Sequence, residues 1–163
     1  MREILFRGKT KAITGCPYNN GKPDGEWVFG YVFPDLGAMK IRQHETDRPE
    51  CNDYEVDPET VGQYTGLIDK NGKKIFEGDI VRYGDTIHEV VFEQRNGTAY
   101  FGLVYSESET LPFGHYQDLR QIEVIGNIYD TPELLKGAMK PAATDVAQSG
   151  LMPATENFSL QEA

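Results

Sequence analysis

The sequence lacks several features that would narrow its function at once. Its 163 residues include two cysteines, Cys16 and Cys51, whose separation matches neither a CxxC redox motif nor a zinc-ligand spacing, so no disulfide framework is expected. Long hydrophobic runs are absent as well, because no stretch approaches the roughly 20 apolar residues that a membrane-spanning helix needs. Charged residues also interrupt the apolar start of the chain. We therefore expect no membrane association and a cytoplasmic location.

Positive charge is scarce. Sixteen Lys and Arg residues stand against 26 Asp and Glu residues, which gives a formal net charge of −10. Nucleic-acid binding relies on basic side chains that release counterions from phosphates, so this balance disfavours a nucleic-acid partner over most of the surface.

The signatures of common enzyme classes are also missing. The sequence has no GxSxG, Walker A, GxGxxG or HExxH motif. Four evenly spaced glycines resemble a phosphate-binding loop, but turn chemistry explains them better, since no helix is expected to follow: Gly66, Gly72, Gly78 and Gly84. A non-enzymatic protein is favoured, and no cofactor is predicted.

What the sequence does have is the pattern of a mainly β protein. Seventeen glycines, nine prolines and short Val, Ile, Tyr and Phe runs alternate with turn signals. Strands are predicted over residues 3–9 and 26–33, and a closing strand over 121–129. Asp130 or Thr131 can then cap one short helical turn that begins at Pro132.

Three turns predict a meander over residues 67–105. Asn71-Gly72 suits a two-residue turn that would pair Asp69 with Lys74 and Ile68 with Ile75. A second turn is expected at Gly84-Asp85. We predict that these strands form an antiparallel meander that curls into a small barrel-like domain.

The third turn, Asn96-Gly97, makes the clearest hairpin. It pairs Val90 with Leu103 and Phe92 with Phe101 on one apolar face, which is expected to pack inward, and leaves Glu93 on the other face.

The composition divides the chain into one domain and a tail. Residues 1–137 are predicted to form the β domain, with N-terminal strands in 1–62 and the meander in 63–135. Residues 138–163 contain one aromatic residue and no clear periodicity, which is typical of a flexible, disordered tail. The alternative is a partner-binding peptide around residues 151–153 or 158–160.

Aromatic residues alternate along the predicted strand 26–33. Strand geometry places them on one face, opposite Val28, Gly30 and Val32. Acidic residues rather than basic ones flank the row, so a buried core is the favoured interpretation and a binding surface that stacks bases or a ligand is the alternative. The row consists of Trp27, Phe29, Tyr31 and Phe33.

Acidic residues are concentrated in residues 45–59. Only Arg48 opposes seven acids there, and the EF-hand spacing is missing. A solvated loop is the plain interpretation. The functional alternatives are a phosphate-mimicking surface that binds a basic protein, and a weak divalent-cation site. The acids are Glu45, Asp47, Glu50, Asp53, Glu55, Asp57 and Glu59.

The three histidines lie in no ligand motif. His44 stands beside the acids, His88 falls on the apolar face of the predicted hairpin and His115 lies in a predicted loop. A satisfied structural histidine is favoured for His88 over a catalytic or metal-binding one.

Three ordered segments resemble the YopX family of bacteriophage and prophage proteins. Residues 63–81, QYTGLIDKNGKKIFEGDIV, carry the strongest likeness. MREILFRGK at 1–9 with GEWVFGY at 25–31 resembles the family's amino-terminal signature, and EVIGNIYDTPELL at 123–135 its carboxy-terminal one. The resemblance implies a mainly β fold, carriage on phage or prophage genomes and no assigned biochemical activity, so there are no catalytic residues to carry over.

Three functional hypotheses follow. The first is a non-enzymatic module that binds an unknown host or phage protein. The second is a module for single-stranded nucleic acid, in which the aromatic row works with Arg2, Arg7, Lys9 and Lys11. The third is a metal-assisted enzyme that uses His44, Glu45 and Asp47. A homo-oligomer remains open, since an uncovered edge strand can pair with a second copy.

Overall fold

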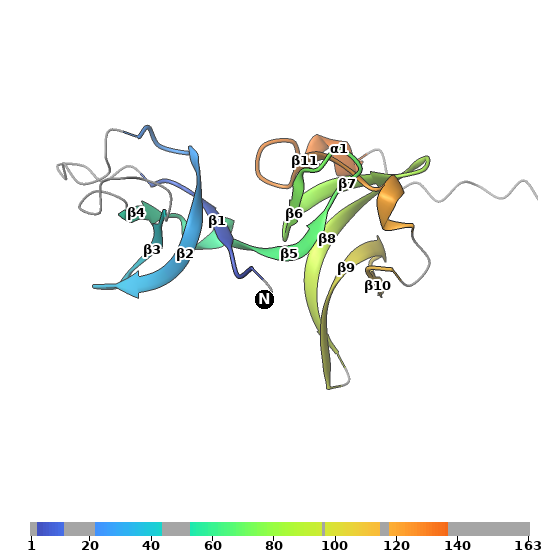
Figure 1. Ribbon diagram of the computed structural model, residues 1–163, viewed down its shortest axis with the longest axis horizontal. Helices are drawn as coiled ribbons and strands as arrows, with labels where there is room; N and C mark the ends of the chain where they lie inside the picture. The colour runs from blue at the N-terminus through green and yellow to red at the C-terminus, as the bar shows by residue number, and fades with distance from the viewer. Residues whose placement is uncertain (1–2, 12–21, 44–52, 96, 115–117, 137–163) are drawn as a thin grey trace, which may run out of the picture.

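The computed structural model describes residues 3–11, 22–43, 53–95, 97–114 and 118–136. Over these residues the chain forms antiparallel strands in two sheets and a single short helix (Figure 1). The predicted mainly β fold is thereby confirmed. The sheets curve but are not closed into a barrel, so the predicted domain is barrel-like only in a loose sense. The expected tail lies outside the described residues. No helix among the described residues is both long and apolar enough to cross a membrane.

The first sheet has the strand order β4-β3-β2-β1-β5-β6. One bridge between Thr10 and Val56 joins the end of β1 back to the edge strand β4. This half of the molecule therefore wraps around a small core of Val28, Ile41, Tyr54 and Val56. The strands are β1 Phe6–Lys9, β2 Trp27–Asp35, β3 Ala38–Arg42, β4 Asp53–Val56, β5 Gly62–Ile68 and β6 Lys74–Phe76.

The second sheet has the order β10-β9-β8-β7-β11. Short 3₁₀ turns at Pro58–Thr60 and Leu119–Gln121 precede β5 and β11, and the helix α1 at Glu133–Lys136 follows β11 where the sequence predicts one helical turn. The strands are β7 Asp79–Tyr83, β8 Thr86–Arg95, β9 Thr98–Ser106, β10 Glu109–Pro112 and β11 Glu123–Asn127.

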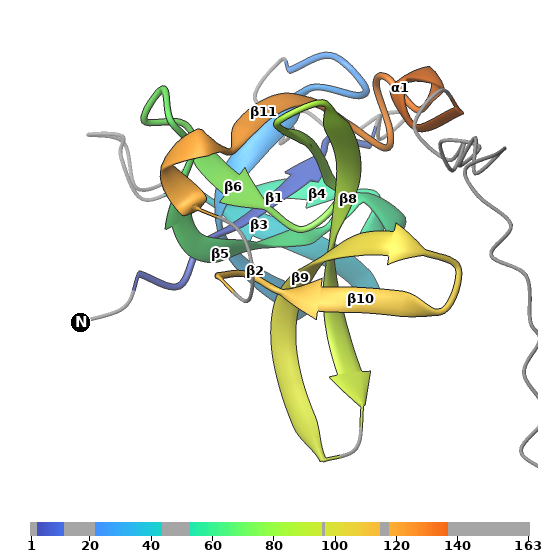
Figure 2. The same cartoon turned by 90° about the vertical axis from the view of Figure 1, so that its right-hand side faces the viewer.

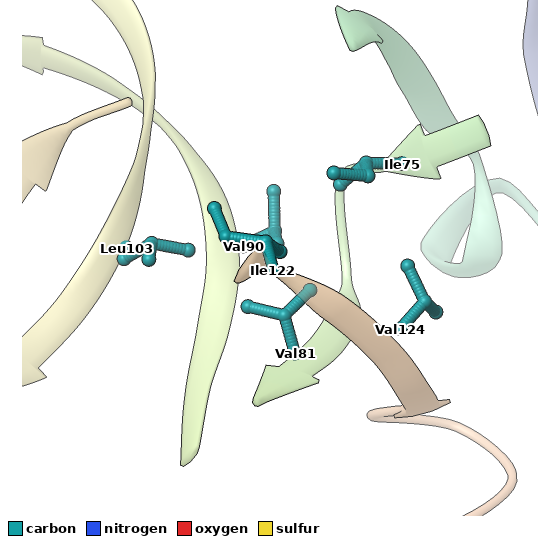
Figure 3. Packing of buried hydrophobic residues seen from close by; sticks show 6 residues of the cluster. All are labelled: Ile75, Val81, Val90, Leu103, Ile122 and Val124. Atoms are coloured by element: carbon teal, nitrogen blue, oxygen red, sulfur yellow. The ribbon is translucent and has the colours of Figure 1, made fainter. Parts of the chain in front are cut away.

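A second core fills the second half of the molecule. Figure 3 shows its side chains converging from several strands. Ile75 comes from β6, the last strand of the first sheet, so β5 and β6 link the two halves, as the course of β5 in Figure 1 shows. The cluster consists of Ile75, Val81, Val90, Leu103, Ile122 and Val124.

The register predicted for the Asn96-Gly97 hairpin is confirmed, and so is the turn expected at Gly84-Asp85. Phe92 pairs with Phe101 and Val90 with Leu103, as the Asn96-Gly97 turn predicts. The turn at Gly84-Asp85 pairs Tyr83 with Thr86. The apolar face packs inward only near its base, because the hairpin then projects from the sheet (Figure 2) and Phe92 remains 41% exposed.

The register predicted around Asn71-Gly72 is wrong. Ile68 pairs with Lys74 instead of Ile75, and the N–H of Gly72 donates to the carbonyl of Asp69. A three-residue loop therefore replaces the two-residue turn, with Gly72 in the left-handed region at φ 82°. The shift frees the Asp69 carboxylate from Lys74 and lets it bind backbone N–H groups.

The predicted meander also divides between the sheets. β5 and β6 belong to the first sheet, whereas β7, β8 and β9 belong to the second. Gly78, at φ 77°, makes the turn between β6 and β7. Consecutive antiparallel strands thus continue through residues 67–105, but the pairing is interrupted once.

Candidate functional site

The aromatic row of β2 points away from the core. Val28 is fully buried among the core residues, whereas Phe29 is 43% and Tyr31 52% exposed. The expectation that the aromatic row forms the core is therefore wrong. Gly30 accounts for part of this arrangement, since a Cβ there would come within 1.9 Å of the Arg42 carbonyl oxygen, so the inner side of β2 has no room for a side chain at this position.

Cross-strand neighbours extend this row into a surface. Residues paired directly across antiparallel strands share a face, and β3 and β4 place charged residues beside the aromatics. Tyr31 pairs with Arg42, which pairs with Asp53. We call this surface the outer face. Its residues are Arg7, Lys9, Trp27, Phe29, Tyr31, Phe33, Lys40, Arg42, Asp53 and Glu55.

Carboxylates neutralise the cations of the outer face. Arg42 donates through Nε and Nη2 to Asp53 at 2.6 and 2.7 Å, and this hydrogen bonding lowers the pKa of the Asp53 carboxyl. Lys40 donates to Asp35 at 2.6 Å. The surface therefore carries aromatic area among paired charges, with little positive charge left for a phosphate chain.

One end of the outer face is closed by a junction between the two halves of the molecule. Arg7 is buried and donates to Asp79 Oδ1 at 2.6 Å and to the carbonyl of Glu77 at 3.0 Å. Its guanidinium lies 4.7 Å from the Trp27 ring centroid and 5.1 Å from that of Phe76. This buried pair ties β1 to the start of β7.

Asp130 completes the junction. It accepts hydrogen bonds from Trp27 Nε1 and Asn127 Nδ2, each at 2.7 Å, and from Lys9 Nζ. Burial alone would raise the pKa of Asp130, but these hydrogen bonds lower it to about 2. Trp27 also packs on Tyr129, with ring centroids 5.8 Å apart. Trp27 is thus held in place, whereas Phe29 and Tyr31 present open aromatic area.

The described acids of the segment 45–59 divide into two groups. Asp53 and Glu55 lie on the outer face, beside the cations of β3. Asp57 instead caps a 3₁₀ turn by accepting from the N–H of Glu59 at 3.1 Å, and Tyr129 Oη donates to the Glu59 carbonyl at 2.6 Å. The candidate site therefore includes the aromatic row and the first two acids, and Asp57 and Glu59 stand beyond its junction end.

The structure leaves the metal hypothesis untested. His44, Glu45 and Asp47 lie outside the described residues, as does Arg2 of the nucleic-acid hypothesis. Among the residues that are described, no group of three or more His, Cys, Asp or Glu side chains could hold a metal ion. His88 is buried, and its two ring nitrogens lie 2.9 Å from the Val104 carbonyl oxygen and 2.8 Å from Thr86 Oγ1, as expected of a satisfied structural histidine.

The segments that resemble the YopX family meet at the junction. Arg7, Trp27, Asp79 and Asp130 come from four separate stretches of those segments. A family model described as YopX protein matches residues 35–136. The chain belongs to the YopX family. The matched range includes β3 to α1, whereas β1 and most of β2 precede it. A comparison of this YopX-family chain with curated proteins found no match.

Sequence reasoning missed several residues of the outer face and the junction. Lys40 and Arg42 stand two positions apart, and this spacing signals one face of a strand, but no strand was predicted there. Tyr129 and Asp130 come from the far end of the domain. Nothing in the local sequence could reveal their contacts with β1 and β2.

Proposed function

We propose that this YopX-family chain is a non-enzymatic binding module whose outer face docks a protein of its bacterial host or of a phage. The observation that carries the proposal is the exposure of Phe29 and Tyr31 on a strand whose other face is the core. Carriage on a phage or prophage genome and action in the cytoplasm are part of the proposal. They rest on the family resemblance and on the composition.

The chemistry of the outer face suits a protein partner. Protein interfaces commonly place aromatic residues at the centre and polar or charged residues around them. Here the paired charges Arg42–Asp53 and Lys40–Asp35 border the aromatic row. Leu36, fully exposed at the tip of the β2–β3 turn, adds apolar area at the end of the same strand.

Affinity capture with matched variants tests the proposal. The intact chain and the double variant Phe29→Ser, Tyr31→Ser are used to capture proteins from host lysate. The control is Phe92→Ser, since Phe92 is an equally exposed strand residue that also packs on one phenylalanine ring. We expect the double variant to capture at least about tenfold less of the partner than the intact chain does, and the control to capture as much as the intact chain. Equal capture by all three forms would show that the outer face is not the docking surface.

One observation favours a second candidate, a surface for single-stranded nucleic acid. The Arg42 guanidinium lies 5.0 Å from the Phe33 ring centroid, beside open aromatic area on which bases could stack. Titration with a single-stranded oligonucleotide, followed by Trp27 fluorescence, distinguishes the two candidates. Salt-sensitive quenching would support nucleic acid. An unchanged spectrum would leave the protein partner as the better explanation.

A further inference from the structure

A basic hollow lies on the second half of the molecule and shares no residue with the outer face. Its volume is about 310 Å³. It forms where the loop after β5, the strands β7 and β11 and the 3₁₀ turn Leu119–Gln121 come together. The lining residues are Lys70, Arg82, Gly84, Arg120, Gln121 and Glu123.

The backbone around the hollow is held in place by buried interactions. The Asp69 carboxylate accepts from the N–H groups of Asn71 and Lys73, both at 2.8 Å, and from that of Val124 at 3.0 Å. The N–H of Lys70 donates to the Ile122 carbonyl at 2.8 Å. The loop that carries Lys70 is thus fixed against β11, so the backbone that positions Lys70 beside Glu123 is formed without a ligand.

Three cations face the hollow from three different elements. Lys70 and Arg82 both point at Glu123, Lys70 at 2.8 Å and Arg82 only at 4.0 Å. Arg120 donates to Asp118 at 3.0 Å through Nε and at 3.3 Å through Nη2. Set against the two carboxylates, Glu123 and Asp118, the three cations leave a net charge of +1 here, in a chain whose overall net charge is −10. Guanidinium carries five N–H donors, so Arg82 and Arg120 keep donors for a ligand.

We propose that this hollow binds a phosphate group. Two guanidinium groups and one ammonium line the hollow, and together they match an anion with several oxygen acceptors better than a single carboxylate, which one guanidinium would satisfy. The volume also exceeds that of a bare ion and lies at the lower end of the usual range for ligand sites, so the phosphate would be part of a larger molecule. This site is independent of the function proposed for the outer face.

Inorganic phosphate is the first probe. The full chain is titrated with sodium phosphate at constant ionic strength, and the backbone amide resonances of Gly84, Arg120 and Gln121 are followed. We expect saturable shifts, and at least about fivefold weaker binding in Arg82→Gln. The matched control is Arg95→Gln, because Arg95 is similarly exposed and also lies 4.0 Å from one glutamate, yet stands on the projecting hairpin.

The outcomes separate clearly. Saturable binding that Arg82→Gln weakens and Arg95→Gln preserves supports the site. Linear shifts, or equal affinities for both variants, overturn it. Adenosine monophosphate and a single-stranded oligonucleotide then identify the source of the phosphate. Tighter binding of the mononucleotide indicates a small phosphorylated ligand, whereas tighter binding of the oligonucleotide with a steep salt dependence indicates a nucleic-acid chain.

Discussion

At the scale of single residues, Asp69 shows how a polar side chain changes its role with the register of a hairpin. The hairpin register predicted from the sequence pairs Asp69 with Lys74. Such an exposed ion pair contributes little to stability. In the structure Asp69 is buried and accepts three backbone N–H hydrogen bonds. Burial alone would raise the pKa of its carboxyl, but these bonds lower it. Asp69 therefore organises the loop and the start of β11.

Replacement of Asp69 distinguishes the two roles. We expect Asp69→Ala to reduce the free energy of unfolding by about 3 kcal/mol, because three backbone donors lose a charged acceptor in a buried place. Lys74→Ala is the control, with an expected loss below about 0.5 kcal/mol, since Lys74 forms an exposed pair with Glu3. Urea unfolding of both variants is the measurement. Similar losses in both would favour the ion pair expected from the sequence.

Asp130 gives a prediction that depends on pH. Its pKa of about 2 lies below the ordinary value of 3.8, so its stabilising effect is present above pH 4 and is lost as the pH falls toward 2. The side chain is 40% exposed, so we expect Asp130→Asn to cost only about 1 kcal/mol at pH 7. The difference from the natural chain should shrink between pH 4 and pH 2 in urea unfolding. A difference independent of pH would show that the carboxylate charge does not contribute.

At the scale of the element, β2 separates what the sequence could predict from what it could not. Alternation correctly put Trp27, Phe29 and Tyr31 on one face, because side chains alternate along any strand. Alternation does not say which face is buried. The prediction chose the face with the larger hydrophobic side chains, and that choice was wrong. Part of the reason is Gly30, where β3 comes too close for a side chain. That contact is long in range and leaves no local pattern.

The turn after β2 carries backbone strain that a substitution should relieve. Leu36 has φ 48° and Gly37 φ 86° in the two-residue connection between Asp35 and Ala38. Leucine is disfavoured in this left-handed region, whereas asparagine tolerates it. Because Leu36 is fully exposed, Leu36→Asn loses no packing. We expect it to raise the free energy of unfolding by about 0.5–1 kcal/mol. Leu36→Ala keeps the strain, and a gain as large in that control would refute this explanation.

At the scale of the whole molecule, the two small cores depend on their connection. The buried Arg7–Asp79 pair and the hydrogen bond from Trp27 to Asp130 join the halves, together with β5 and β6. The mainly β class, two of three hairpins and the terminal helical turn could be predicted, since all are local signals. The junction and the division of the meander between the two sheets could not be predicted, because they depend on contacts between residues up to 121 positions apart. The division into segments 1–62 and 63–135 stays a prediction, as does the tail.

The central claim is that the outer face meets a partner. Photo-cross-linking tests it most directly, with a photoreactive phenylalanine analogue placed at Tyr31 in one form of the chain and at Tyr105 in another. Both tyrosines are exposed strand residues, at 52% and 38%, but Tyr105 lies on the second sheet. In host lysate, we expect a discrete protein adduct from position 31 and none from position 105. An adduct from position 105 alone, or none from either, would contradict the assignment of the outer face as the binding surface.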